Sequence, residues 1–306
     1  MNNEARQSDP HAVAALLLTQ FMFGTATVLG KFALLAFPPV ALVGFRVGGA
    51  AITFAIIQRL RGNLRLEEKS HYLRFAVFGL IGIALNQLLF FKGLSLTKAA
   101  NTSLLAVTIP IFTIAISVLF GFDKLTWRKV VGIIAAAAGV IYLIDPSRAS
   151  FSSETTRGDV MIVLNSLCYA FYVVISKKLI SHYGALKSIA WLFIFGSFVN
   201  VPVGLISLSD VDLSSISAAS WAFAVSLVIF PTILAYYFSA FSISRVEPSV
   251  VAVYVYLQPL IGFVSAVIFL DEHFTFRLLV ASILVFAGVF LVTRKPRGSE
   301  EIIAAN

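Results

Sequence analysis

The chain has 306 residues, of which 59% are hydrophobic and only 12% are charged. Soluble domains carry about 25% charged residues, so this composition excludes an ordinary water-soluble fold and indicates that the bilayer is the solvent. The net charge of +8 is spread over the predicted membrane loops and forms no groove-sized basic cluster. We therefore expect a lipid bilayer as partner and no nucleic acid.

Apolar stretches of membrane-spanning length follow one another along almost the whole chain. A helix needs roughly 20 such residues to cross the hydrocarbon core. We therefore predict an all-α integral membrane protein with ten transmembrane helices. The expected spans are residues 12–36, 39–58, 72–91, 99–120, 128–144, 160–178, 188–209, 217–240, 248–270 and 277–293.

Residues 98–144 and 247–293 read as two copies of one unit. Aligned without a gap at an offset of 149 residues, ten of their 47 positions are identical. Such a duplication in an apolar chain is typical of transporters built from two related halves. The matched landmarks are Pro110 with Pro259, Thr126 with Thr275, Arg128 with Arg277, and Gly139 with Gly288.

The distribution of Lys and Arg predicts that both chain ends are cytoplasmic. Sixteen of these residues fall on the side of the ten-span arrangement that holds both termini, and five fall on the other. Because each half has five spans, the second half enters the membrane from the opposite face, which predicts a 5+5 inverted repeat around a central cavity. The expected parts are a first half at 12–144, a linker loop at 145–159, a second half at 160–293, and cytoplasmic tails at 1–11 and 294–306.

Polar side chains follow one face of the first span and one face of the sixth, with the same helical spacing in both. Matching stripes in equivalent helices indicate a shared substrate cavity, although hydrogen bonds between helices would explain them equally well. The stripes comprise Gln20, Gly24, Thr27 and Lys31 in the first span, and Asn165, Tyr169, Tyr172 and Ser176 in the sixth.

Two cations, Lys31 and Arg46, fall within spans. A charge at such a position costs about 2.5–3.5 kcal/mol on insertion scales, so it needs water or a partner. One interpretation is a positive site that attracts a carboxylate or a phosphate. The alternatives are snorkelling to the outer surface and, for Arg46, a structural contact within the close-packing spacing of Gly44 and Gly48.

Further hydrogen-bonding groups in other spans complete the candidate substrate site. They are Asn86 and Gln87 in the third span, Tyr236 in the eighth, and Tyr254 and Gln258 in the ninth. Tyrosines at span centres suit a partly apolar solute, but they are also frequent in interface belts.

Pro110 and Pro259 are expected near the middle of the fourth and ninth spans. A proline inside a helix lacks an N–H and clashes with the carbonyl four residues back, here those of Ala106 and Val255. These prolines are therefore predicted to bend their helices and to serve as gating hinges. A packing kink without a role in gating is the alternative.

All fifteen Asp and Glu, and all four His, are placed in loops or near span ends by this arrangement. Proton relays usually rely on carboxylates or His within the membrane, and none is evident. The sequence also has no phosphate-binding glycine loop, metal-spaced cluster or nucleophile–base pair. We therefore expect neither a cofactor nor an enzyme activity.

The chain resembles the drug/metabolite transporter superfamily, in its EamA-domain branch. The resemblance is carried by Lys31, Arg46, the segment NQLLFFKGLSLTKAANTSLL at 86–105, and the repeated segments 110–139 and 259–288. It implies a 5+5 inverted-repeat fold with alternating access, and export of amino acids or related metabolites. Amino-acid exporters of the YddG type are the nearest analogy.

These patterns together predict a transporter of small organic solutes in the inner (plasma) membrane of a bacterium, with the monomer as functional unit. One alternative is a transporter of another metabolite class, such as nucleotide-sugar-like or drug-like solutes. A membrane-embedded lipid enzyme and a receptor or scaffold without transport are further alternatives.

Overall fold

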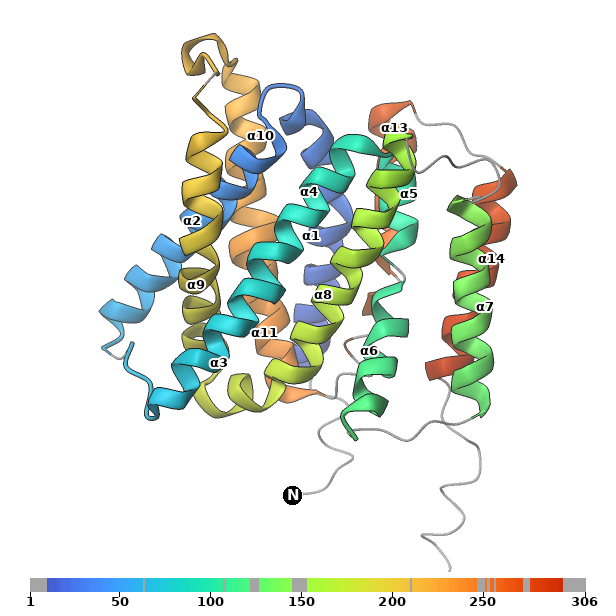
Figure 1. Cartoon of the computed structure of the whole chain (residues 1–306), viewed down its shortest axis with the longest axis horizontal. Coiled ribbons are helices and arrows are strands. Elements are labelled where there is room, and N and C mark those ends of the chain that lie inside the picture. The colour runs from blue at the N-terminus through green and yellow to red at the C-terminus, as the bar shows by residue number, and fades with distance from the viewer. Residues whose placement is uncertain are drawn as a thin grey trace, which may run out of the picture.

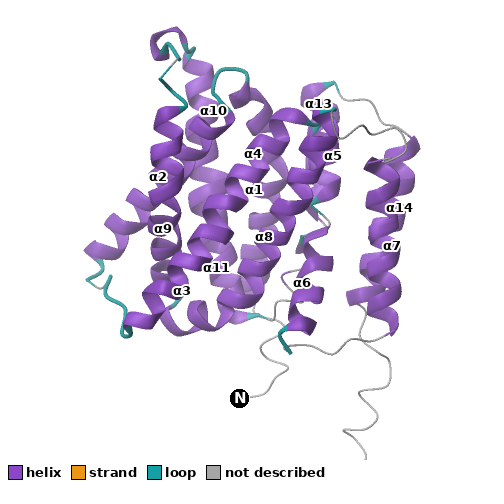
Figure 2. Cartoon of the chain, viewed as in Figure 1, coloured by secondary structure: helices purple, strands orange, loops and turns teal. Residues whose placement is uncertain are grey.

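The structure, a computed structural model, is helical with no strand in the residues that it describes (Figure 2). Those residues are 10–62, 64–106, 108–121, 127–144, 153–209, 211–246, 251, 254–255, 257–271 and 276–293. The expected all-α class is confirmed. The helices are α1 (Pro10–Leu34), α2 (Pro39–Leu60), α3 (Lys69–Gly79), α4 (Asn86–Leu96), α5 (Ala99–Leu105), α6 (Thr108–Leu119), α7 (Trp127–Ile144), α8 (Glu154–Tyr183), α9 (Ala185–Ile206), α10 (Ala218–Val228), α11 (Ala235–Arg245), α13 (Leu257–Leu270) and α14 (Phe276–Thr293).

Seven helical stretches in the described part of the chain are long and apolar enough to cross a membrane, judged by length and composition. They are Pro10–Leu34, Pro39–Leu60, Lys69–Leu96, Asn101–Leu119, Glu154–Tyr183, Ala185–Ile206 and Ala218–Arg245. Helices α7, α13 and α14 lie where the other three spans are predicted, with 18, 14 and 18 residues.

Helix α8 begins earlier than the sequence suggests. The side chain of Ser153 accepts a hydrogen bond from the N–H of Thr156 at 3.3 Å and so caps the helix, which starts at Glu154. Residues 154–159 therefore belong to the helix and not to the predicted linker. The polar character of this stretch, which favours a loop, reflects an N-terminal helical turn instead.

Two of the long helices are each interrupted by one π-helical turn. These turns span Leu80–Leu85, between α3 and α4, and Ile229–Leu234, between α10 and α11. They lie 149 residues apart, the same offset as the sequence repeat. Single π turns bend a helix and are frequent at functional sites.

Pro231 accounts for the second π turn. It has no N–H to donate to the carbonyl of Leu227, four residues earlier, so that carbonyl loses its helical partner. The hydroxyl of Thr232 donates to the Leu227 carbonyl at 2.7 Å in its place. In the first π turn, the side-chain amide of Asn200 from α9 donates to the carbonyl of Ala84 at 3.4 Å.

The helix around Pro110 is split and not merely kinked. Pro110 is the third residue of α6, where the missing N–H costs no helical bond, and α5 ends before it at Leu105. The carbonyl of Ala106 accepts the N–H of Ile109 at 3.0 Å, so it is not left without a donor. The expected mid-helix kink is thus replaced by an interruption between two helices.

Pro259 occupies the corresponding third position of α13. The carbonyl of Val255 accepts the N–H of Gln258 at 3.0 Å, which repeats the arrangement at Ala106 with an offset of 149 residues. Here too the proline lies in the first turn of a helix, where its missing N–H breaks no hydrogen bond of α13. The role of Pro110 and Pro259 as gating hinges stays a prediction.

The tightest packing joins helices from opposite ends of the sequence. Helix α2 packs along α9, and α7 packs along α14 at one edge of the molecule (Figure 1). A Cβ atom built on Gly44 would lie 3.0 Å from the Cα of Gly204 and from the carbonyl of Asn200, so the α2 and α9 backbones touch. Small residues permit this approach, which is how helices associate in lipid.

We expect Gly44→Leu to separate α2 from α9, because a side chain at this position has no room between the two backbones. Overpacking typically costs about 1–3 kcal/mol, so the midpoint of thermal unfolding in detergent should fall by several degrees. Ala115→Leu, which adds comparable bulk at an exposed position of α6, should melt like the wild type. Equal melting of both variants would contradict this crossing.

Candidate functional site

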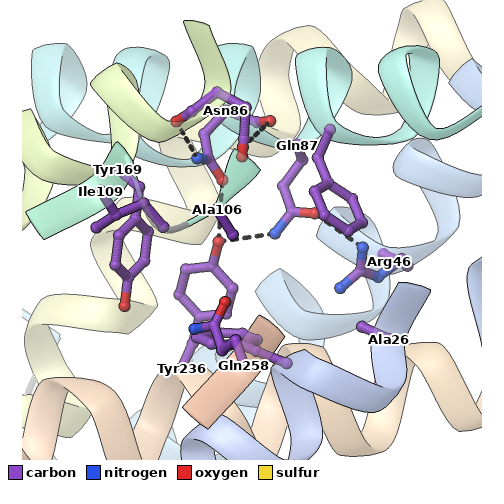
Figure 3. A pocket seen from close by; sticks show the side chains of 12 residues that line it. Ala26, Arg46, Asn86, Gln87, Ala106, Ile109, Tyr169, Tyr236 and Gln258 are labelled. Atoms are coloured by element: carbon purple, nitrogen blue, oxygen red, sulfur yellow. Dashed lines mark hydrogen bonds between the residues drawn. The ribbon is translucent and has the colours of Figure 1, made fainter. Parts of the chain in front are cut away.

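A cavity lies among the helices, lined by residues from both halves of the sequence (Figure 3). Seven polar residues line it: Arg46, Asn86, Gln87, Asn165, Tyr169, Tyr236 and Gln258. Its apolar lining consists of Phe23, Ala26, Phe90, Ala106 and Ile109. The π turns deliver three of the polar side chains, because Asn86, Gln87 and Tyr236 directly follow them.

Arg46 on α2 is only 2% exposed and is held from several sides. Its Nη1 donates to Oε1 of Gln87 at 2.9 Å, and its Nε donates to Oγ1 of Thr232 at 2.8 Å. Its Nη2 donates to the carbonyl of Pro231 at 3.3 Å, and the guanidinium lies 4.4 Å from the ring centroid of Phe91. The charge therefore stays inside the protein and does not snorkel to the surface.

The hydrogen bonds continue from Arg46 through the two halves of the chain (Figure 3). The amide of Gln87 donates to the Tyr236 hydroxyl at 2.8 Å, and that hydroxyl donates to Oδ1 of Asn86 at 3.2 Å. Asn86 and Asn165 each donate to the other's backbone carbonyl, at 3.1 and 2.8 Å. Gln87 and Tyr236 are 149 residues apart, so the repeat brings equivalent positions into direct contact.

Arg46 keeps hydrogen-bonding capacity for a ligand. A guanidinium has five N–H donors in a planar fork, and three of them bind the groups just described. Each terminal nitrogen makes one hydrogen bond within the described part of the chain, so each has a second N–H that can donate to a ligand such as a carboxylate. No Asp or Glu is among the described residues that line the cavity, so its charge is positive.

Three predicted site residues on α1 do not line the cavity. A Cβ on Gly24 would lie 2.8 Å from Ile261, so this glycine allows α1 to pack on α13. The hydroxyl of Thr27 donates to the Gly24 carbonyl at 3.0 Å within the helix. Gln20 accepts a hydrogen bond from the amide of Gln258 and therefore supports a lining residue from behind.

Two predicted tyrosines also lie outside the lining. Tyr172 is fully buried against the first π turn, where a Cβ on Gly82 would lie 2.7 Å from its own Cβ. Its hydroxyl has no hydrogen-bond partner in the described part of the chain. Tyr254 is partly buried and packs against the main hydrophobic core. Neither is placed to contact a solute in this cavity.

Lys31 lies at a helix end and not in the cavity. Its ammonium donates to the carbonyl of Thr97, the residue that ends α4. Lys177 on α8 does the same for Val246, which ends α11, at 3.2 Å. Thr97 and Val246 are 149 residues apart, so the two lysines occupy equivalent places. A cation at a helix C-terminus interacts favourably with the exposed carbonyls and the helix dipole.

Sequence reasoning did not single out Thr232, although this side chain orients Arg46. The signal was present, because Pro231 lies inside the eighth predicted span and must free a carbonyl there. The apolar lining residues Phe23 and Phe90 carried no such signal, since aromatic residues are abundant in every span.

A polar cavity inside a bundle of membrane-spanning helices is the architecture of a solute transporter. The family model of EamA-like transporters matches residues 11–144 and 156–294, and the chain belongs to this family. The predicted resemblance to the EamA branch of the drug/metabolite transporter superfamily is confirmed. The protein is therefore a multi-pass membrane transporter that works on a small molecule in a lipid environment.

Similar proteins are known from all three domains of life. An uncharacterized transporter of Archaeoglobus fulgidus is 28% identical over 92% of this chain and 96% of its own length. The uncharacterized transporter YvbV of Bacillus subtilis is 29% identical, with 95% of both chains covered. A WAT1-related protein of Arabidopsis thaliana is 25% identical over 73% of this chain and 68% of its own.

One crystal structure of a protein has a closely similar fold, with a TM-score of 0.68 and 18% sequence identity. The match covers 94% of this chain and 97% of the other. The helices thus follow an arrangement that experiment has observed over almost the full length of both chains.

Because both lysines hold the end of a helix, we expect Lys31→Ala and Lys177→Ala to lower the unfolding midpoint by similar amounts. The loss should be on the order of 1 kcal/mol for each, the usual contribution of a cation at a helix C-terminus. Thermal unfolding in detergent measures it, with Lys92→Ala at an exposed position of α4 as the control. A Lys31→Ala variant of full stability that no longer transports would instead return Lys31 to the substrate site.

Proposed function

We propose that this EamA-family protein exports a small metabolite that bears a carboxylate, most simply an amino acid, across the inner membrane of a bacterium. The observation that carries the proposal is the buried guanidinium of Arg46, which faces a cavity of neutral amides and aromatic rings. A fixed cation with two remaining N–H donors suits a carboxylate better than any neutral group.

The rest of the lining suits the other parts of an amino acid. Side-chain oxygens of Asn86, Asn165 and Gln258 can accept hydrogen bonds from an ammonium group. The ring of Phe23 stands edge-on to Tyr236, with centroids 5.5 Å apart, and gives an apolar wall for a side chain. The seven predicted substrate residues at the cavity are therefore retained in the proposed site.

We also propose that ten helices form a 5+5 inverted repeat around this cavity, with halves at 12–144 and 160–293. The supporting observation is that contacts between a helix of the first half and a helix of the second half have counterparts between the equivalent helices with the halves exchanged. Helix α4 packs on α8, and its equivalent α11 packs on α1; likewise α6 packs on α8, and α13 packs on α1. A pseudo-two-fold axis produces this exchange.

Alternating access would then arise from rocking of the halves about the α2–α9 and α7–α14 contacts. The π turns lie next to the cavity and supply bending points, because their helical hydrogen bonds are already irregular. Cytoplasmic termini and a monomeric functional unit complete the proposal, the former supported by the excess of Lys and Arg on that side.

Purified protein in liposomes should give saturable flux of at least one member of an amino-acid and metabolite panel, read by mass spectrometry of the lumen. The reason is that a cavity with a fixed orientation of donors binds a limited set of solutes. Empty liposomes are the control. Folded protein that moves no member of the panel in either direction would overturn the proposal.

Carboxylate recognition by Arg46 predicts that the transported solute loses at least about tenfold in flux when its carboxylate is converted to the primary amide. A primary amide is uncharged and cannot form the charge-assisted bidentate pair with the guanidinium, so the neutral analogue should bind poorly. Arg46→Lys keeps the charge but not the fork, and it should weaken the preference for carboxylate over amide. Equal flux of acid and amide in the wild type contradicts this assignment, whatever the fate of the variants.

A further inference from the structure

Asp159 is a carboxylate buried inside the protein, which the sequence does not suggest. It lies in the second turn of α8, in a stretch that reads as a loop, and it is only 3% exposed. Its charged neighbours on the same turns, Glu154 and Arg157, are exposed. The burial of Asp159 is therefore specific to this side chain and does not belong to the helix end as a whole.

The carboxylate of Asp159 is bound to the junction between α4 and α5. Thr97 donates its hydroxyl hydrogen to Oδ1 at 2.5 Å, and the side-chain amide of Asn101 donates to Oδ2 at 3.4 Å. Thr97 ends α4, and Asn101 lies in the first turn of α5. Asp159 thus links the second half of the sequence to the junction between α4 and α5 in the first half.

The backbones of α4 and α8 are in contact directly beside this carboxylate. A Cβ on Gly93 would lie 2.9 Å from the carbonyl of Gly158, and one on Gly158 would lie 2.9 Å from the N atom of Thr97. Weaker hydrogen bonds to Asp159 would therefore change the packing where α4 and α8 cross. Two glycines thus let the backbones of α4 and α8 meet directly beside the carboxylate.

Other charged groups near Asp159 come from α1 and α4. Lys31 of α1 donates to the backbone carbonyl of Thr97, whose hydroxyl donates to Asp159. Lys92 and Lys98, on α4 and directly after Thr97, are exposed. The described residues of α5 include no titratable side chain. On α8 itself, the cation next to Asp159 in the sequence is Arg157, two residues away.

We propose that Asp159 is a proton-binding site, and that the proton it binds controls the contact between α8 and the α4–α5 junction. This inference deepens the proposed transport function by naming a proton as a second ligand. The ionised carboxylate accepts both hydrogen bonds and holds the junction closed. Proton binding converts one oxygen to a donor, which removes an acceptor from the junction and the charge that strengthens the other bond.

Binding of one proton to Asp159 changes both the charge of the carboxylate and its two hydrogen bonds. Burial disfavours the charged carboxylate, whereas the two donors favour it, so these two effects oppose each other at this site. Proton binding weakens both hydrogen bonds, which shifts a two-state equilibrium at the junction severalfold or more. No second reactant is needed, since the proton comes from water at this end of the protein.

Spin-label distances test the proposal without any solute. Cysteines replace Lys92 on α4 and Thr155 on α8, both exposed, in a background where Cys168 is changed to Ser. The labelled protein is reconstituted in lipid, and the distance distribution is recorded over a pH series from mildly alkaline to mildly acidic. A second, longer distance population should grow as the pH falls.

The Asp159→Asn variant should give one distribution that does not change with pH, because its amide cannot titrate. Glu154→Gln, which removes an exposed carboxylate from the same helix, should keep the full response of the parent. Thermal unfolding of each variant first establishes that it is folded. Asp159→Glu, which keeps a titratable acid, preserves a pH response if the asparagine variant proves unstable.

A parent protein with no pH-dependent population, or an Asp159→Asn variant that responds like the parent, overturns the proton site. Because these distances are measured without solute, either result leaves the transport proposal intact. Conversely, a negative solute panel together with a pH-dependent junction would overturn the transport proposal alone.

Discussion

The architecture rests on one constraint, that a backbone carbonyl released from a helix within a bilayer must find a donor inside the protein. Broken and π-turned helices release several such carbonyls near the centre of this molecule. The carbonyl of Pro231 is satisfied by Arg46, that of Leu227 by Thr232, and that of Ala84 by Asn200. The polar side chains around the cavity are therefore first of all the partners of an interrupted backbone.

This origin explains how a strong charge comes to lie in a membrane protein without a carboxylate beside it. The carbonyl and side-chain oxygens around Arg46 lie where a counter-ion would otherwise be needed. At the equivalent π turn, the neutral amide of Asn200 performs the backbone task alone. The two π turns thus differ in the charge of the side chain that binds them. Among the described residues that line the cavity, the cation is Arg46.

Composition and periodicity were sufficient to predict the helical membrane class and the family, because about 20 consecutive apolar residues have few other uses. The repeat offset of 149 residues recurs in features that the sequence analysis did not predict, such as the matching π turns and the paired helix ends at Thr97 and Val246. Seven predicted site residues lie at the cavity because polar groups within spans are rarely placed without a partner.

The remaining site could not be read from the sequence, for reasons specific to each residue. Helical spacing places Gly24 and Thr27 on the face of Gln20, but it does not say whether that face meets a cavity or another helix such as α13. Lys31 lies on the same face, and yet its ammonium binds the carbonyl of Thr97 at the end of α4, which its long side chain permits. The burial of Asp159 was not predicted, because a polar stretch in the sequence is equally compatible with a loop and with a capped first turn of a helix.

The contact between Arg46 and Thr232 has a consequence for biosynthesis, since 186 residues separate the two. Ribosomes add about 5–20 residues per second, so Arg46 is synthesised on the order of 10–40 seconds before its partner exists. Throughout that interval the nascent first half holds a cation that its own helices cannot fully neutralise. Until then Arg46 must lie in the hydrated interior of the insertion machinery or in the lipid headgroup layer. The final burial of α2 waits until the helical segment that carries Thr232 has been made.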